Sequence, residues 1–152
     1  MGISRKLTLG EITMLKSVFG SQITYDSVLI HDYKWWPFQP ARTTMTPNGE
    51  EYWNKNDYVA DFSHADLSKR AWFIHEGAHL YQHYGLQWDV KARGIFDRNY
   101  NYTLDPNKTK LADYGLEQMG DIARDYYVLV NGGSIAKPYV LSNYLGLLPI
   151  PY

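Results

Sequence analysis

The sequence has no cysteine, and this absence removes several kinds of chemistry. A thiol nucleophile, a zinc site built on cysteines and a disulfide framework are all excluded. The absence does not indicate a compartment, because a cysteine-free protein tolerates reducing and oxidising surroundings alike. A chain of 152 residues has the usual length of one domain and can bury a stable core without disulfides or a structural metal. We therefore predict a single domain over residues 1–152.

Long apolar runs and an excess of charge are absent as well. No apolar stretch approaches the roughly 18 residues of a membrane-spanning helix, and residues 1–10 lack the apolar core of a signal peptide. We therefore expect no membrane span, and synthesis in the cytoplasm without a signal peptide. The formal net charge is −1, and no basic, aromatic-interleaved patch occurs, so nucleic acid is not an expected partner. A G-x-S-x-G elbow and a glycine-rich phosphate loop are also missing.

Local signals predict three long helices, one short helix and several short strands. Thr8 and Glu11 form a capping-box pattern ahead of a first helix that ends near Gly20. A second helix is predicted over residues 66–84, and a third from residue 111 or 113 to 130. The shorter predicted elements are strands at 27–31, 43–46, 51–53 and 99–104, a hairpin turn at 47–49, and a last short helix over 138–146. These elements predict an α+β fold with a small β-sheet, the rest of the chain being irregular, including most of 86–112.

One five-residue motif carries chemistry. His75-Glu76-Gly77-Ala78-His79 places two histidines four residues apart, so a helix presents both on one face. Two imidazoles in this arrangement can bind one metal ion, and H-E-x-x-H on a helix is typical of zinc metallopeptidases. Glu76 is then the predicted general base, which takes a proton from zinc-bound water and delivers it to the leaving amine.

A hydrolytic zinc site needs a third protein ligand and one open position. Glu117 is the strongest candidate, because Glu117 and Asp121 lie four residues apart on the third predicted helix and face the same way. In this arrangement Glu117 binds the ion, and Asp121 accepts a hydrogen bond from the outer nitrogen of His75. His64, before the motif helix, is a weaker alternative, and His83 is disfavoured because it lies about 12 Å along the helix axis from His75. Two histidines and one glutamate favour Zn²⁺, while the affinity order alone leaves copper, cobalt and nickel open.

The negatively charged oxygen that forms during peptide hydrolysis needs a hydrogen-bond donor besides the ion. Tyr114 and Arg124 lie three residues before and seven residues after Glu117, on the same predicted helical face. Tyr102, in the predicted strand before this helix, is a third candidate. We take Tyr114 as the predicted catalytic partner of Glu76.

Short motifs spread from residue 7 to residue 127 resemble those of a known family. They are Leu7-Thr8-Leu9-Gly10-Glu11, Val18-Phe19-Gly20, the segment 25–31, Phe73-Ile74-His75-Glu76-x-x-His79 with Gln82, Tyr100-x-Tyr102, and Glu117-Gln118-x-x-Asp121-Ile122. The chain resembles the zincin-like metallopeptidase toxin domains that are carried on type VI secretion spike proteins or encoded beside Rhs proteins. The two predicted helices carry the specific part of this resemblance. Gly77, Ala78 and Tyr81 depart from it, since bulkier residues, and tryptophan in place of Tyr81, are expected there.

The resemblance implies a function, a location and partners. It implies a bacterial effector, carried by a spike or Rhs protein, that a contractile apparatus delivers to the periplasm of a neighbouring cell. It implies zinc ligands at His75, His79 and Glu117, with Glu76 as base, and hydrolysis of peptide bonds in proteins or in peptidoglycan stem peptides. A neutralising immunity protein is a further expected partner. Two other functions stay open: an intracellular processing metallopeptidase, and a non-catalytic adaptor of a spike or Rhs protein that uses zinc only for structure.

Overall fold

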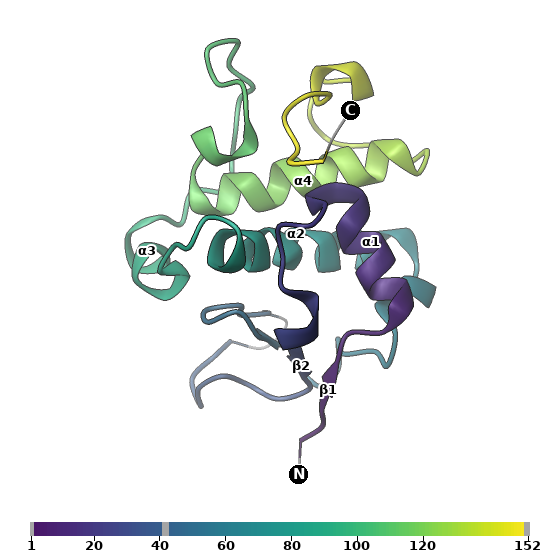
Figure 1. Cartoon of the computed structure of the whole chain (residues 1–152), viewed down its shortest axis with the longest axis vertical. Coiled ribbons are helices and arrows are strands. Elements are labelled where there is room, and N and C mark those ends of the chain that lie inside the picture. The colour runs from purple at the N-terminus through teal and green to yellow at the C-terminus, as the bar shows by residue number, and fades with distance from the viewer. Residues whose placement is uncertain (1, 41–42, 151–152) are drawn as a thin grey trace.

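Two long helices form the centre of the molecule. The computed structural model describes residues 2–40 and 43–150, and its helices α2 (Leu67–Tyr84) and α4 (Leu116–Val130) pack against each other (Figure 1). The side chain of Asp66 caps α2 by accepting a hydrogen bond from the third helical N–H. α2 therefore spans its predicted range almost entirely. α4 begins later than predicted, after a separate 3₁₀ turn, η3 (Leu111–Asp113).

A buried carboxylate fixes the amino end of the first helix. α1 (Leu9–Phe19) follows Thr8, whose hydroxyl accepts a hydrogen bond from the Glu11 N–H while the Glu11 carboxylate accepts one from the Thr8 N–H. This reciprocal pair confirms the predicted capping box. The same carboxylate accepts hydrogen bonds from both terminal nitrogens of Arg5, at 2.8 and 2.9 Å, and from the Phe62 N–H at 2.8 Å. These contacts satisfy a fully buried charge and attach α1 to two other segments of the chain.

α1 packs closely on α2 because Gly77 has no side chain. A Cβ atom at Gly77 would lie 2.5 Å from Cδ2 of Leu15 and 2.9 Å from Cε2 of Phe19. Glycine costs roughly 0.8–1.0 kcal/mol of helix propensity relative to alanine, and here it makes room for two apolar side chains of α1. On a helix, position 77 faces away from positions 75 and 79. α1 therefore supports the motif helix from the side opposite its two histidines.

The sheet is small and partly parallel. Strands β1 (Ser4–Lys6), β2 (Leu29–His31) and β3 (Glu51–Tyr52) pair in that order, β1 with β2 antiparallel and β2 with β3 parallel. β1 was not predicted, because three residues with two basic side chains show no apolar alternation. The predicted hairpin is reduced to one antiparallel bridge between Met45 and Tyr52, since β3 pairs mainly with β2. Helices and sheet together confirm the α+β fold class.

The strand predicted at 99–104 is wrong, because this segment is held by side chains and not by another strand. The carbonyl oxygen of Asn101 accepts a hydrogen bond from the Gln118 amide at 2.9 Å, and that of Tyr102 accepts one from Lys137 at 2.5 Å. The segment therefore lies beside the first turn of α4 without regular secondary structure.

The other corrections concern helices. Residues 86–112, predicted to be mostly irregular, contain α3 (Val90–Phe96), which the side chain of Asp89 caps. The helix predicted over 138–146 is limited to the 3₁₀ turn η4 (Leu141–Asn143). Two more 3₁₀ turns, η1 and η2, cover Tyr25–Ser27 and Phe62–His64. No helix in residues 2–40 or 43–150 has the length and apolar character needed to cross a membrane.

Candidate metal centre

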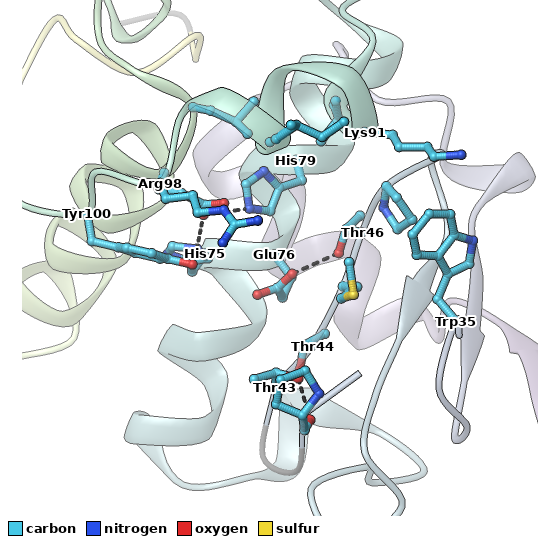
Figure 2. Close-up of a pocket in the computed structure, with 18 of the residues that line it drawn as sticks. Trp35, Thr43, Thr44, Thr46, His75, Glu76, His79, Lys91, Arg98 and Tyr100 are labelled. Atoms are coloured by element: carbon cyan, nitrogen blue, oxygen red, sulfur yellow. Dashed lines mark hydrogen bonds and ion pairs between the residues drawn. The ribbon is translucent and has the colours of Figure 1, made fainter. Parts of the chain in front are cut away.

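Two histidines of α2 and one glutamate of α4 converge where the helices meet. His75 and His79 are 7% and 5% exposed, and both project toward the first turn of α4. Oε1 of Glu117 lies 3.1 Å from Nε2 of His75 and 3.0 Å from Nε2 of His79 (Figure 2). One ligand atom from each of the three residues lies within 4.8 Å of the others. The structure thus brings together the three residues predicted as metal ligands.

Hydrogen bonds on the outer nitrogens fix both imidazole rings. Nδ1 of His75 lies 2.8 Å from Oδ1 of Asp121, as predicted, and a carboxylate accepts, so Nδ1 carries the proton. Nδ1 of His79 lies 2.9 Å from Oε1 of Gln82, whose amide nitrogen donates to the Leu116 carbonyl at 2.8 Å. Because that carbonyl only accepts, the amide oxygen of Gln82 must face His79. In the neutral form of each histidine, Nε2 is therefore the unprotonated nitrogen, and it lies on the side of Glu117.

The distances from Glu117 to the two histidine nitrogens are close to those around a tetrahedral ion. Zinc bonds of 2.0–2.1 Å separate neighbouring ligand atoms by about 3.3 Å, and the two measured nitrogen–oxygen distances are 3.0 and 3.1 Å. Two imidazole nitrogens and one carboxylate oxygen also form a donor set of hydrolytic zinc sites that leaves one position open. The residues present therefore fit a zinc ion in both chemistry and spacing.

Gly120 allows the His75 ring to lie against α4. A Cβ atom at Gly120 would come within 2.6 Å of both Cε1 and Nδ1 of His75, a distance that real Cβ contacts do not show. The glycine lies between Glu117 and Asp121, so one turn of α4 supplies an acceptor on each side of the ring and the space between them. Sequence reasoning identified the two carboxylates but not the need for this glycine.

The pKa values of the cluster favour a positive charge beside Glu117. Burial lowers the pKa of His75, but hydrogen bonds to Asp121 and Glu117 outweigh burial and raise this pKa to about 10. Burial opposes ionisation of Glu117, but its hydrogen bonds to His75 and His79 dominate and hold its pKa well below the usual range. The cluster is therefore an anionic environment that stabilises a cation next to Glu117.

Glu76 lies beside the cluster with its carboxyl group directed into the same pocket (Figure 2). Burial raises the pKa of Glu76 above its usual value, although both histidines and a hydrogen bond from Thr46 act in the opposite direction. Oγ1 of Thr46 donates this bond to Oε1 at 2.8 Å. Oε2 has no hydrogen-bond partner within the part of the chain that the structure describes. Glu76 thus combines a fixed position, an accessible oxygen and increased proton affinity, which are the properties of a general base.

These residues lie in a cleft that continues on both sides of Glu76. One pocket has a volume of about 460 Å³ and a second about 410 Å³, and both are lined by His75, Glu76 and Tyr100. Trp35 and Trp36 line the larger pocket, while Trp72 lines the smaller one. A cleft of this form can hold an extended chain across the cluster.

Tyr114 does not lie in this cleft, so its predicted position beside the cluster is wrong. Its side chain is buried elsewhere, and its hydroxyl accepts a hydrogen bond from the Asp105 N–H at 3.0 Å. The prediction extended helical spacing back from Glu117, but α4 begins only at Leu116. Tyr102 is also outside the cleft, with its hydroxyl hydrogen-bonded to Asp125 at 2.5 Å.

Tyr100 is the tyrosine that sequence reasoning missed. It lines both pockets, and its ring stacks on His75 with centroids 6.0 Å apart. Burial, together with nearby carboxylates, raises the pKa of Tyr100 to about 12, so the phenol keeps its proton. The Tyr100-x-Tyr102 pattern was the only signal for it. Arg124 lines the smaller pocket but pairs with Asp121 at 3.1 Å.

The alternative histidine ligands do not belong to the cluster. His64 is exposed and lies 3.5 Å from Asp61, and His83 packs edge-on against Tyr84 with centroids 4.6 Å apart. Within residues 2–40 and 43–150, the only grouping of three possible ligands is the cluster at α2 and α4.

The molecule is thus a small α+β domain with a two-histidine, one-glutamate cluster in a cleft between helices and loops. No protein-family model matches the sequence. The chain is 38% identical over 135 residues, 84% of its length, to the type VI secretion system spike protein VgrG2b of Pseudomonas aeruginosa, and it spans 13% of that protein. The solved structure of the VgrG2b effector domain matches 84% of the chain and 75% of that domain, with a TM-score of 0.76 and 37% identity.

The chain therefore belongs to the family of the VgrG2b effector domain. The predicted resemblance to effector domains of spike proteins is confirmed to this extent. Metallopeptidase activity, the zinc ion and the site of action stay predictions.

Proposed function

We propose that this chain is a zinc-dependent metallopeptidase that acts as an antibacterial type VI secretion effector. The observation that carries the proposal is the convergence of His75, His79 and Glu117, with Nε2 of both histidines directed inward, next to the buried carboxyl group of Glu76. A site that used zinc only for structure would not need a cleft or a carboxyl group free to accept a proton.

Each of three residues of the cleft has a separate role in the proposed peptide hydrolysis. When bound, zinc supplies a Lewis acid that polarises a carbonyl group and acidifies water. Glu76 accepts the proton of the attacking water and returns it to the leaving amine, while Thr46 holds its other oxygen in place. Tyr100 keeps its proton at neutral pH and donates to the carbonyl oxygen as that oxygen gains charge.

Family membership supports the biological part of the proposal. VgrG2b is a spike protein, and the matching part of it is an effector domain. We propose that the present chain is likewise associated with a spike or Rhs carrier and acts in the periplasm of a target cell on proteins or peptidoglycan stem peptides. An immunity protein would protect the producing cell.

The test compares the wild-type chain with Glu76→Gln, and with Asp26→Asn as a control for the loss of an exposed carboxylate. Purified, zinc-loaded protein is assayed against unstructured peptides, and metal content is measured in parallel. We expect Glu76→Gln to retain zinc and to lose peptide hydrolysis by at least about 100-fold, the contribution of a positioned general base. Equal activity of Glu76→Gln and wild type would exclude this catalytic role.

Growth of a susceptible bacterium locates the target. The same variants are expressed with and without an added periplasmic signal sequence. Killing by exported wild type alone supports a periplasmic metallopeptidase. Killing from the cytosol moves the substrate there. Folded, zinc-loaded protein that hydrolyses no peptide and kills in neither place supports a non-catalytic adaptor.

A further inference from the structure

We propose that Arg98 binds a carboxylate group of the substrate, so that the cleft selects peptides with a free carboxylate beside the bond to be cleaved. This inference rests on the proposed peptidase function. It identifies Arg98 as a specificity-determining residue of the same site.

Arg98 is directed into the cleft, and no acidic side chain in the described part of the chain pairs with it. It follows α3, lines the larger pocket, and extends toward the space that His75, Glu76 and His79 also line (Figure 2). It makes no hydrogen bond, ion pair or ring contact with any residue in the described part of the chain.

The other arginines that the structure describes all have partners. Arg5 pairs with Glu11, and Arg124 pairs with Asp121 and Asp125. The remaining two pack on aromatic rings, Arg70 on Tyr127 and Arg93 on Trp88. The contrast is strongest between Arg98 and Arg124, because both border the cleft and only Arg124 is neutralised by the protein itself.

The charge of the larger pocket also favours an anionic ligand. Its charged lining residues are Glu76, Glu117, Lys91 and Arg98. A divalent ion at the cluster would offset the charges of the two glutamates, which leaves the charges of Lys91 and Arg98 unbalanced. The whole chain has a net charge of −1, so this local positive excess is not a property of the protein surface in general.

A carboxylate is the group that best matches this arrangement. The guanidinium group is planar and donates two parallel hydrogen bonds to a carboxylate, whereas Lys91 acts only as a point charge. Nζ of Lys91 also lies 5.1 Å from the centre of the Trp35 ring, so this charge already has an aromatic partner. The carboxylate can come from an acidic side chain or from the carboxyl terminus of the peptide, and these two sources require separate tests.

The experiment is the digestion of a mixed-sequence peptide library by zinc-loaded wild type, Arg98→Gln, Arg98→Lys and Arg93→Gln, with cleavage sites read by mass spectrometry. Arg93→Gln is the matched control, because Arg93 belongs to α3 and lies outside both pockets. Half of the library carries a free carboxyl terminus and half an amidated one. Preferred peptides are then resynthesised with Glu or Asp replaced by Gln or Asn.

We expect wild type and Arg93→Gln to prefer the carboxylate-bearing peptides by about tenfold or more, the usual size of a charge-assisted contact. Arg98→Gln should lose this preference, so that it cleaves a carboxylate-bearing peptide and its neutral analogue at similar rates, and Arg98→Lys should retain part of it. Loss of cleavage on amidation identifies the chain terminus as the carboxylate, and loss on Glu→Gln or Asp→Asn exchange identifies the side chain.

A binding measurement separates recognition from turnover. In zinc-loaded Glu76→Gln protein, the affinity for a preferred fluorescent peptide should fall about tenfold when Arg98→Gln is added, and should not change when Arg93→Gln is added. Cleavage by wild type without any carboxylate preference would overturn the inference and leave the proposed function intact. So would an equal loss by Arg98→Gln on all peptides, which would mean that Arg98 acts at the reacting carbonyl. Absence of any peptide cleavage by zinc-loaded wild type would overturn both.

Discussion

The two walls of the cleft are built in different ways. The helical wall consists of α2, α3 and α4, and the loop wall consists of residues 33–40 and 43–53. On the helical wall, each histidine of the cluster is buried and fixed by a hydrogen bond on its outer nitrogen. The loop wall has only short strand pairing and exposes large apolar side chains, including Phe38 at 78%.

The loop wall is nevertheless organised by one buried side chain. Gln39 accepts a hydrogen bond from the Trp35 N–H at 2.9 Å and donates to the carbonyls of Thr43 and Tyr52 at 3.1 and 3.2 Å. It therefore holds the aromatic loop against β3 without placing that loop in the core. The comparison teaches that the wall with the metal-type chemistry is fixed by packing, while the exposed side chains of the facing wall, such as Phe38, can change at little cost to stability.

The largest expected effect on zinc affinity comes from removing the carboxylate ligand of the helical wall. Glu117→Gln should weaken zinc binding by at least about 100-fold, since even outer partners of a ligand contribute 10–100-fold. Competition with a metal-binding dye measures the affinity, and circular dichroism shows whether α4 is retained. Unchanged zinc affinity in this variant would mean that the third ligand is another residue.

A smaller loss is expected from Gly120→Ala, which tests how closely the two helices must approach. The added methyl group would meet the His75 ring at 2.6 Å and displace it, so zinc affinity should fall by about 10-fold or more even though alanine favours helix. Gly94→Ala is the control, because a Cβ there meets only Cδ2 of Leu116 at an ordinary 3.7 Å. That variant should keep its zinc affinity and gain roughly 0.5–1 kcal/mol of stability.

Thr46→Val tests the one hydrogen bond by which the loop wall contacts the predicted base. This bond lowers the pKa of Glu76, so its removal should raise that pKa further above the usual value. Because the base acts when deprotonated, the acidic limb of the kcat/KM profile should move to higher pH, with little change at alkaline pH. Thr13→Val, on an exposed site of α1, should leave the profile in place. A shift to lower pH in Thr46→Val would contradict the assignment of Glu76 as base.

The smallest expected effect is on stability, and it concerns an exposed side chain of the loop wall. Phe38→Ala should change the free energy of unfolding by no more than about 0.5 kcal/mol, as is usual for exposed positions. Phe73→Ala, at a fully buried position of α2, should cost about 3–5 kcal/mol. Urea denaturation measures both. A loss at Phe38 as large as that at Phe73 would mean that Phe38 packs as a core residue.

Features that depend on local spacing were predictable. The capping box of Thr8 and Glu11 requires only residues three apart, and the helix that carries His75 and His79 requires only helical periodicity. The pairing of Glu117 with Asp121 on one face of α4 follows from the same rule.

Features that depend on where a segment docks were not predictable. Tyr114 precedes the true start of α4, so helical spacing misplaced it, while Tyr100 reaches the cleft from an irregular segment with no periodicity. The contact between Thr46 and Glu76 joins residues 30 positions apart on different elements. The proton on Nδ1 of His79 depends on Gln82, and Gln82 in turn on a carbonyl of α4.

The sequence by itself determined α1 with its capping box, α2, most of α4, and which polar residues share a helical face, because these depend on interactions within a few residues of the chain. Only the tertiary structure decided that the faces of α2 and α4 meet with Gly120 against His75, which outer partners orient the imidazoles, and which tyrosine and arginine enter the cleft. Those outcomes depend on packing between segments far apart in the chain, where the close approach of side chains, and not periodicity, selects the arrangement.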